Sequence, residues 1–175
     1  MRRKIILLFL LISTLAACSM DKNEVKDSPL YEGRDLTIGV VGKIPDVRER
    51  NIVFKSIDLN DIRKGNLSSK YDAIFIMKEH LIEVARAPYA KIYKNSGIPF
   101  FFIESKKSHV PFIKAEIEYD AFPDTDSGEY ASGYYHLSDD TEKSWGYGLY
   151  NDTVNEVNIL DVFSRIFMTI KTIDQ

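Results

Sequence analysis

Three continuous apolar runs constrain the fold of this chain more than any other feature of its 175 residues. They are Leu36 to Val41 (LTIGVV), Tyr71 to Met77 (YDAIFIM) and Ile98 to Ile103 (IPFFFI). A strand with one solvated face alternates polar and apolar residues, whereas a strand covered on both faces is apolar throughout. We therefore expect three central strands of a parallel sheet that is covered by helices on both faces.

The segments around these runs supply the other elements of such a fold. Asn51 to Ile57 predicts a further strand, Leu59 to Lys64 a short helix capped by Asp58, and Glu79 to Lys94 a helix kinked near Pro88. Strands that alternate with helices in this way predict an α/β domain with a mostly parallel sheet flanked by helices.

The last third of the chain has a different character. Phe112 to Phe122 is expected to be extended, and Tyr130 to Leu137 with Ser144 to Leu149 is expected to form an aromatic-rich hairpin. In Val154 to Ile173 the apolar residues recur at helical spacing, which predicts a C-terminal amphipathic helix. The predicted apolar stripe of this helix consists of Val157, Leu160, Phe163, Phe167 and Ile170.

The N-terminus carries the features of an export signal in the required order. Basic residues 2–4 precede an apolar run from Ile5 to Ile12, and small residues then lead to Cys18. This stretch is too short for a transmembrane helix, which needs about 20 apolar residues, and the polar, charged residues 19–27 follow it at once. We therefore interpret residues 1–17 as a signal peptide.

The tetrapeptide Leu15-Ala16-Ala17-Cys18 resembles the lipobox of bacterial lipoproteins, and the chain resembles the small lipoproteins of Gram-positive bacteria. The resemblance implies acylation of the Cys18 thiol, cleavage after Ala17, and anchoring to the cell membrane on its extracytoplasmic face. The expected organisation is then a signal peptide at 1–17, a lipidated N-terminus and flexible tether at 18–34, and a single α/β domain at 35–175. The alternative is an ordinary secretory signal followed by a chance cysteine.

Charge and cysteine content exclude several classes of function. Loss of residues 1–17 removes three of the 23 basic residues and none of the 26 acidic ones, which leaves a formal side-chain charge of −6. An acidic domain is a poor partner for nucleic acid. Because Cys18 is the only cysteine, its lipidation leaves no thiol for a disulfide, a nucleophile or a metal ligand.

Polar side chains follow the predicted strands, at the edge where open parallel sheets bind their ligands. The candidate ligand-binding residues at these carboxyl ends are Lys43, Lys78, Glu79, His80 and Glu104. Together they would suit an anion or another polar ligand. The alternative is that they are polar because loops at strand ends are solvated.

Residues Tyr71 to Ser105 resemble one lobe of the type 1 periplasmic-binding fold, through the segments DAIFI and SGIPFFFIES. The same pattern is found in flavodoxin-like domains, so the resemblance implies a fold rather than a function. A complete solute-binding protein of that family has two such lobes, and this chain has the length for one.

Motifs of common catalytic, cofactor and metal sites are missing from the sequence. The glycine-containing turn that ends at Gly42 lacks the third glycine of a dinucleotide loop, and there is no G-x-S-x-G segment. The three histidines lack zinc-site spacing, and a calcium loop that began at Asp124 would have Glu129 where glycine is required. We expect no catalytic residue, no metal and no cofactor.

Aromatic residues are concentrated between Tyr119 and Tyr150. Tyr and Trp dominate binding hot spots, so Tyr134, Trp145 and Tyr147 are candidates for a partner surface. The alternative is that these side chains pack the hairpin on the C-terminal helix.

The leading functional prediction is a non-enzymatic, membrane-tethered binding or interaction module at the cell envelope. Its expected partners are the lipid bilayer, through acylated Cys18, and an envelope protein or a cell-wall component. One alternative is an envelope hydrolase or transferase that uses Glu79, His80 and Glu104, which must then lie within hydrogen-bond reach in a pocket. The other is a single-lobe sensor of a small ligand, which requires a partly apolar pocket at the strand ends.

Overall fold

The computed structural model describes residues 28–126, 128–138 and 141–173. The predicted signal peptide, the lipobox with Cys18 and residues 19–27 of the predicted tether lie outside these ranges. Within the described part of the chain, no helix combines the length and the apolar character needed to cross a bilayer.

The three apolar runs form neighbouring strands of one six-stranded sheet with the order β2-β1-β3-β4-β5-β6. Four strands run parallel, namely β1 (Leu36–Val41), β2 (Ile52–Ser56), β3 (Ala73–Ile76) and β4 (Phe100–Ile103). The hairpin strands β5 (Glu129–Ser138) and β6 (Thr141–Gly148) are antiparallel. The sequence therefore predicts the α/β class and the hairpin correctly, in a mixed sheet whose larger part is parallel.

The order in which strands are added to the sheet reverses at β1, because β2 lies on one side of β1 and β3 lies on the other. From β1 the chain passes to β2 over one face of the sheet, where Arg48 donates a hydrogen bond to the Oγ atom of Ser164 at 2.7 Å. It then crosses the other face to form β3. The carboxyl ends of β1 and β3 thus lead into connections on opposite faces, and such a reversal is where open α/β sheets form ligand crevices.

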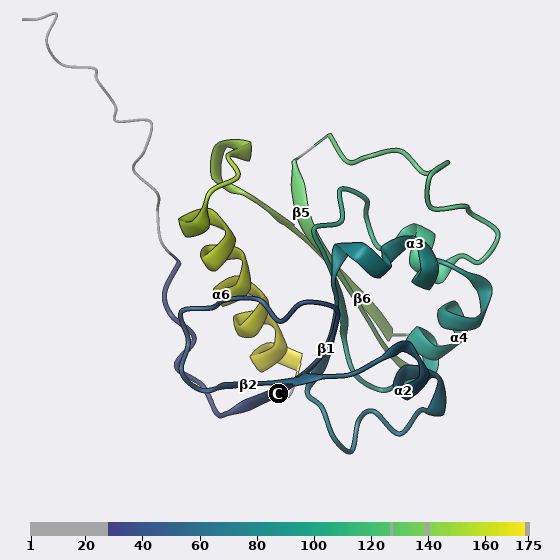
Figure 1. The fold of residues 1–175 in the computed structure, drawn as a ribbon, viewed down its shortest axis with the longest axis horizontal. Helices are drawn as coiled ribbons and strands as arrows, with labels where there is room; N and C mark the ends of the chain where they lie inside the picture. The colour runs from purple at the N-terminus through teal and green to yellow at the C-terminus, as the bar shows by residue number, and fades with distance from the viewer. Residues whose placement is uncertain (1–27, 127, 139–140, 174–175) are drawn as a thin grey trace, which may run out of the picture.

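Helices cover both faces of the sheet, so that the domain has three layers, helix, sheet and helix (Figure 1). One long helix, α6 (Glu156–Ile173), lies on one face, and a short 3₁₀ turn, η2 (Tyr150–Asp152), precedes it. The opposite face carries α2 (Leu59–Lys64), the 3₁₀ turn η1 (Lys78–His80), α3 (Leu81–Val84), α4 (Ala87–Asn95) and α5 (Val110–Ile113).

Two predicted segments differ from the structure. The helix expected over Glu79 to Lys94 is divided into η1, α3 and α4, because Arg86 is extended and Pro88 occupies the first turn of α4. Proline lacks the backbone donor that a helix interior needs but is tolerated in a first turn. The segment Phe112 to Phe122 was expected to be extended, but it begins within α5 and continues through hydrogen-bonded turns.

The apolar strands place alternate side chains on opposite faces and so build two cores. Phe75 and Phe101 point towards α6, with their ring centroids 5.7 Å apart, and Phe75 also packs on Phe163 at 6.0 Å. Phe102 points the other way and stacks on Phe112 of α5 at 3.6 Å. Within the predicted stripe of α6, Phe163, Phe167 and Ile170 are buried, Leu160 is partly buried and Val157 is exposed.

The folded domain begins earlier than the predicted boundary at residue 35. Tyr31 is only 2% exposed, and its ring lies 6.3 Å from that of Phe167. The backbone N–H of Ser28 donates to Asp161 of α6 at 2.6 Å, and Arg48 donates to the Ser28 carbonyl at 3.0 Å. Residues 28–34 are therefore attached to the domain, through the contacts of Ser28 and Tyr31 with α6, rather than forming part of a free tether.

Candidate functional site at the carboxyl edge

Two hollows meet at the carboxyl edge of the parallel strands. The first, of about 400 Å³, lies between the end of β1 and the start of α6; we call it the β1–α6 chamber. The second, of about 380 Å³, lies between the start of β5 and η2; we call it the β5–η2 chamber. Glu104 and Tyr130 line both chambers and separate them.

Glu104 holds an uncommon backbone conformation at the centre of this edge. It directly follows β4 and has a φ of 58°, in the left-handed region that costs a residue with a side chain about 1–2 kcal/mol. Its carboxylate pairs with Lys78 at 2.8 Å. Asn151 and Asp152, with φ values of 49° and 52°, adopt the same region in η2, so three of the four such non-glycine residues in the described part of the chain lie at this edge. Backbone strain of this kind concentrates at functional sites.

Glu79 joins the end of β3 to the loop after β1. Its Oε1 atom accepts a hydrogen bond from the backbone N–H of Lys43 at 3.0 Å. Burial opposes ionisation of Glu79, but hydrogen bonds from backbone N–H groups outweigh it and hold the pKa below its ordinary value. Gly42 permits this contact because a Cβ atom there would lie 2.5 Å from the same oxygen, and its φ of 110° also favours glycine.

Glycines also make room for two carboxylates of the β5–η2 chamber. A Cβ atom on Gly146 would collide with the carboxylate of Glu129, and one on Gly128 would collide with that of Asp152. Burial raises the pKa of Glu129, against a hydrogen bond from Thr125. Burial and the nearby charge of Glu104 raise the pKa of Tyr130 to about 12, so Tyr130 is a neutral hydrogen-bond donor at physiological pH.

An ion pair fixes the outer wall of the β5–η2 chamber. The ammonium group of Lys107, a largely buried side chain, donates to Asp124 at 2.9 Å and to the carbonyl of Phe122. A hydrogen bond from Lys107 is the main reason that the pKa of Asp124 is lowered. The backbone N–H of Thr125 donates to the Lys106 carbonyl at 2.8 Å, which ties this loop to the segment after β4.

The structure brings together only part of the predicted ligand site. Lys43 and Glu104 line the β1–α6 chamber. Glu79 and Lys78 lie outside the lining, where Glu79 accepts a hydrogen bond from the backbone of Lys43 and Lys78 pairs with Glu104. His80 lines neither chamber. No hydrogen bond between Glu79, His80 and Glu104 occurs among the described residues, so the geometry required for the hydrolase alternative is not met.

The residues that sequence reasoning missed come from other elements. Glu129, Tyr130 and Asp152, together with the first turns of α6, complete the chambers. In the sequence, Glu129 drew attention only because it stands where a calcium loop that began at Asp124 would require glycine. The described residues contain no group of three or more His, Asp or Glu side chains that could hold a metal ion. The sequence signal for these residues was the presence of Gly128 and Gly146, because the missing side chains of these glycines make room for the carboxylates of Asp152 and Glu129.

Two of the three residues predicted for a partner surface are buried on opposite faces of the sheet. Tyr134 is 1% exposed on the side of α4, whereas Tyr147 is 5% exposed on the side of α6 and donates to Thr169 at 2.8 Å. Trp145 is partly buried and stacks on Phe101 at 6.1 Å. Strand alternation places Tyr134 on the other face of the sheet from Trp145 and Tyr147, so the three side chains do not share one surface. Packing on the side of the C-terminal helix describes Trp145 and Tyr147 but not Tyr134.

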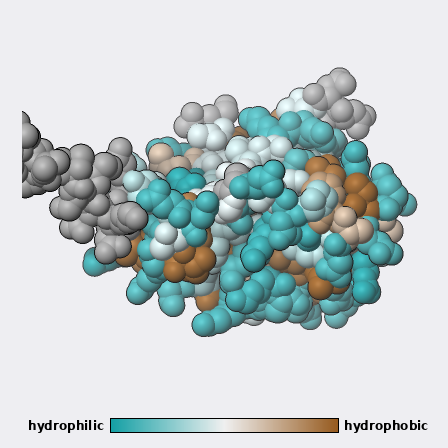
Figure 2. Space-filling model, turned by 90° about the horizontal axis from the view of Figure 1, so that it is seen from above, coloured by the Kyte–Doolittle hydropathy of each residue, from teal (hydrophilic) through white to brown (hydrophobic). Residues whose placement is uncertain are grey.

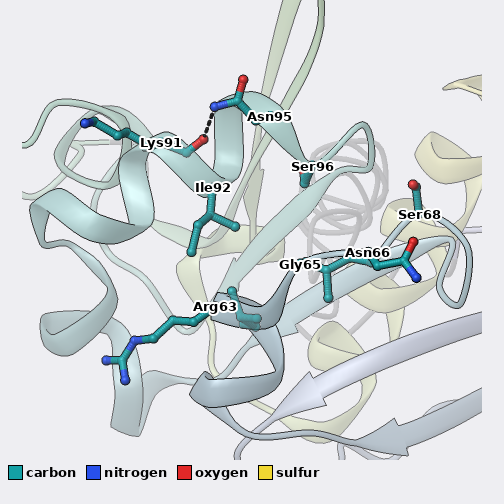
Figure 3. A pocket seen from close by; sticks show the side chains of 10 residues that line it. Arg63, Gly65, Asn66, Ser68, Lys91, Ile92, Asn95 and Ser96 are labelled. Carbon is teal, nitrogen blue, oxygen red and sulfur yellow. Dashed lines mark hydrogen bonds between the residues drawn. The ribbon is translucent and has the colours of Figure 1, made fainter.

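A third hollow, of about 450 Å³, lies at the opposite end of the sheet (Figure 3). It is formed by the loop before β3 and the end of α4. The Arg63 guanidinium points away from it and donates to Tyr89 at 2.6 Å, while Asn95 donates to the carbonyl of Lys91 at 2.7 Å. Because it lies at the amino ends of the strands, and because Arg63 and Asn95 are held by other hydrogen bonds, this hollow is the weaker candidate.

The surface around the end where α6 begins is mostly hydrophilic, with separate hydrophobic patches (Figure 2). Ile44 and Val154, which line the chambers, are 42% and 73% exposed. Exposed apolar side chains at the lining of a hollow are available to a ligand with an apolar part.

Fold and site together define a three-layer α/β domain with a two-chambered hollow at the carboxyl edge of a mixed sheet. Comparison with protein-family models, with curated proteins and with solved structures finds no significant match to the chain.

Proposed function

We propose that this protein is a lipid-anchored, non-catalytic binding module on the extracytoplasmic face of the cell membrane, and that it binds a small ligand in the two chambers. The observation that carries the proposal is that both chambers meet at Glu104 and Tyr130, on the edge where the strand order reverses. Cys18 is the proposed lipid attachment site, which makes the bilayer its first partner.

The dimensions and lining of the chambers support a small ligand. Sites for small molecules have volumes of about 300–1,000 Å³, with apolar walls and a few polar groups that fix orientation. Met77, Ile159 and Phe163 supply apolar wall in the β1–α6 chamber. A carboxylate and a tyrosine hydroxyl stand at the junction, where they can orient a ligand.

The arrangement of the fold supports the same location. The order β2-β1-β3-β4 is that of the first four strands of flavodoxin-like domains, in which the ligand binds where β1 and β3 diverge. We propose a variant of that fold, or a single lobe of the periplasmic-binding type, in which an antiparallel hairpin completes the sheet. Burial of the hairpin aromatics removes the main support for a protein partner held through that hairpin.

The binding proposal is tested by native mass spectrometry of the mature protein purified from its own membrane. We expect an additional small-molecule mass on the wild-type protein. Ile159→Trp should abolish the added mass by filling the β1–α6 chamber. Met168→Trp should retain it, because Met168 of the same helix is 40% exposed and lies outside the chamber. A wild-type protein without any added mass, or equal retention by both variants, would contradict the proposal.

The anchor is tested separately, by labelling cells with radioactive palmitate. The full chain should be labelled and should sediment with membranes, whereas Cys18→Ala should be unlabelled. A chain that is labelled despite the Cys18→Ala change would exclude Cys18 as the attachment site.

A further inference from the structure

The chambers carry more negative than positive charge. Two of their carboxylates, Glu104 and Asp124, are neutralised by lysines at 2.8 and 2.9 Å. Among the described residues no ion pair neutralises Glu129 or Asp152. The lining carboxylates are Asp46, Glu104, Asp124, Glu129, Asp152 and Glu156, and the lining amines are Lys43 and Lys106. A positively charged ligand would therefore be attracted and an anion repelled.

The start of α6 does not offer an anion site. Helix N-termini attract negative charge, but Glu156 already supplies a carboxylate in the first turn of α6 and lines the β1–α6 chamber. An anionic ligand would meet this side chain and also Asp46 in the loop opposite. These two carboxylates disfavour the anionic ligand that the strand-end lysines alone suggest.

The two unpaired carboxylates are held in place by the backbone around them. Glu129 lies over Gly146, and Asp152 lies against Gly128. Any side chain at either glycine would displace the carboxylate beside it. Glu129 is half-buried, and an ionised carboxylate in such a position is stabilised by a cationic partner.

The β1–α6 chamber suits an apolar group. Its wall includes Ile44, Met77, Ile159 and Phe163, and Ile44 is 42% exposed. Tyr130 lies at the junction, where its ring can contact either a cation or an apolar chain.

We infer that the site takes a small organic cation, with a protonated amine bound among Glu104, Glu129 and Asp152 and an apolar portion in the β1–α6 chamber. The inference rests on the proposed function, because it assigns a ligand class to the same two chambers. An amine there donates charge-assisted hydrogen bonds to Glu104 and Glu129, which are partly buried, and to Asp152, which is exposed; the partly buried pair gives the stronger contacts.

The test uses three probes with one apolar body and different charge: 4-phenylbutylamine, 4-phenylbutanol and 4-phenylbutyrate. Each is titrated into the mature chain with Cys18→Ser, and binding is followed by NMR shifts of residues in the chambers. All core residues lie between Tyr31 and Ile170, so this chain retains the whole core. We expect the amine to bind at least about tenfold more tightly than the alcohol, and the carboxylate to be the weakest probe.

The double change Glu129→Gln and Asp152→Asn should remove the preference for the amine and leave the affinity for the alcohol unchanged. Glu116→Gln, an exposed carboxylate outside both chambers, is the control and should change neither. Thermal unfolding of the variants verifies that they are folded.

The outcomes separate the two proposals. Equal binding of all three probes in the chambers, or preference for the carboxylate, would overturn the cation inference and leave the small-ligand site in place. If no probe shifts any chamber residue and the native protein carries no added mass, both proposals fail together.

Discussion

The Oε1 atom of Glu79 accepts a hydrogen bond from the backbone N–H of Lys43 at 3.0 Å, and this contact ties the end of β3 to the loop that follows β1. The loop supplies one wall of the β1–α6 chamber. Glu79, predicted as a ligand-binding residue, therefore shapes the chamber from outside its lining. Stability measurements on its glycine neighbour test this role.

Gly42→Ala should lower the free energy of unfolding by about 1–3 kcal/mol. The new Cβ atom would collide with the carboxylate of Glu79, and the backbone at residue 42 has a φ of 110°, which favours glycine. Urea denaturation measures the change. Gly97→Ala is the matched control: its φ is 69°, but no atom lies within 4 Å of the Cβ position, so only the backbone cost of about 1 kcal/mol remains. Equal losses in both variants would show that the contact with Glu79 is unimportant.

Replacement of Glu104 should separate stability from binding. Glu104→Gly relieves the left-handed strain, whereas Glu104→Ala keeps it, and both lose the ion pair with Lys78. We expect the glycine variant to be the more stable of the two by about 1 kcal/mol in urea denaturation. Both variants should bind the amine probe more weakly than the wild type. A more stable alanine variant would contradict the strain assigned to this position.

Asp161 should make stability depend on pH on the acid side. Burial opposes its ionisation, but hydrogen bonds from Ser28 and the ion pair with Arg165 outweigh it, so the pKa of Asp161 is lowered in the folded state. A lowered folded-state pKa gives stability that is present above the ordinary carboxyl pKa of about 4 and is lost as pH falls through the folded value.

Asp161→Asn should therefore cost about 1–2 kcal/mol at pH 7 and reduce the loss of stability between pH 5 and pH 3. Urea denaturation across this pH range measures both effects, with Glu116→Gln as an exposed control. Limited proteolysis should also cut the variant faster in residues 28–34, which the Ser28 contact holds on α6. Unchanged proteolysis would mean that other contacts hold this segment.

Phe75 should be among the most costly positions in the core. It is fully buried and contacts the rings of Phe101, Phe163 and Phe167, so Phe75→Ala should cost about 3–5 kcal/mol in urea denaturation. Phe54→Ala, on the partly exposed edge strand β2, should cost only about 1–2 kcal/mol. Similar costs would indicate that the core is less tightly packed around β3 than the ring distances imply.

Much of the fold follows from the sequence because burial on both faces leaves a direct pattern. A strand such as Phe100–Ile103 has no polar residue, and a covered strand has this composition wherever it lies in a parallel sheet. The division of the Glu79 to Lys94 segment was partly visible in Pro88. Packing of residues 28–34 on α6 was not visible, because it depends on single contacts such as that of Ser28 with Asp161.

The candidate site was less predictable than the fold. Strand ends identify Lys43 and Glu104, since topology alone brings the carboxyl ends of β1 and β4 to one edge. Glu129 and Asp152 reach the same edge through an antiparallel hairpin and a left-handed turn, and neither feature has a strong signature in one sequence. Tyr134 and Tyr147 illustrate the opposite error, because residue type suggested a surface while strand alternation buries both.

If Cys18 carries the lipid that we propose, the attachment of Ser28 to α6 sets how far from the membrane the domain can lie. Nine residues separate Cys18 from Ser28, and a chain of that length reaches at most about 35 Å even when fully stretched. Under the proposal that Cys18 carries a lipid, the domain would lie within about 35 Å of the bilayer. The helix α6, to which Ser28 is attached, also forms a wall of the β1–α6 chamber. The proposed anchor would therefore restrict the site to ligands at the membrane surface, and a longer connecting segment would extend the reach of the domain without altering the site.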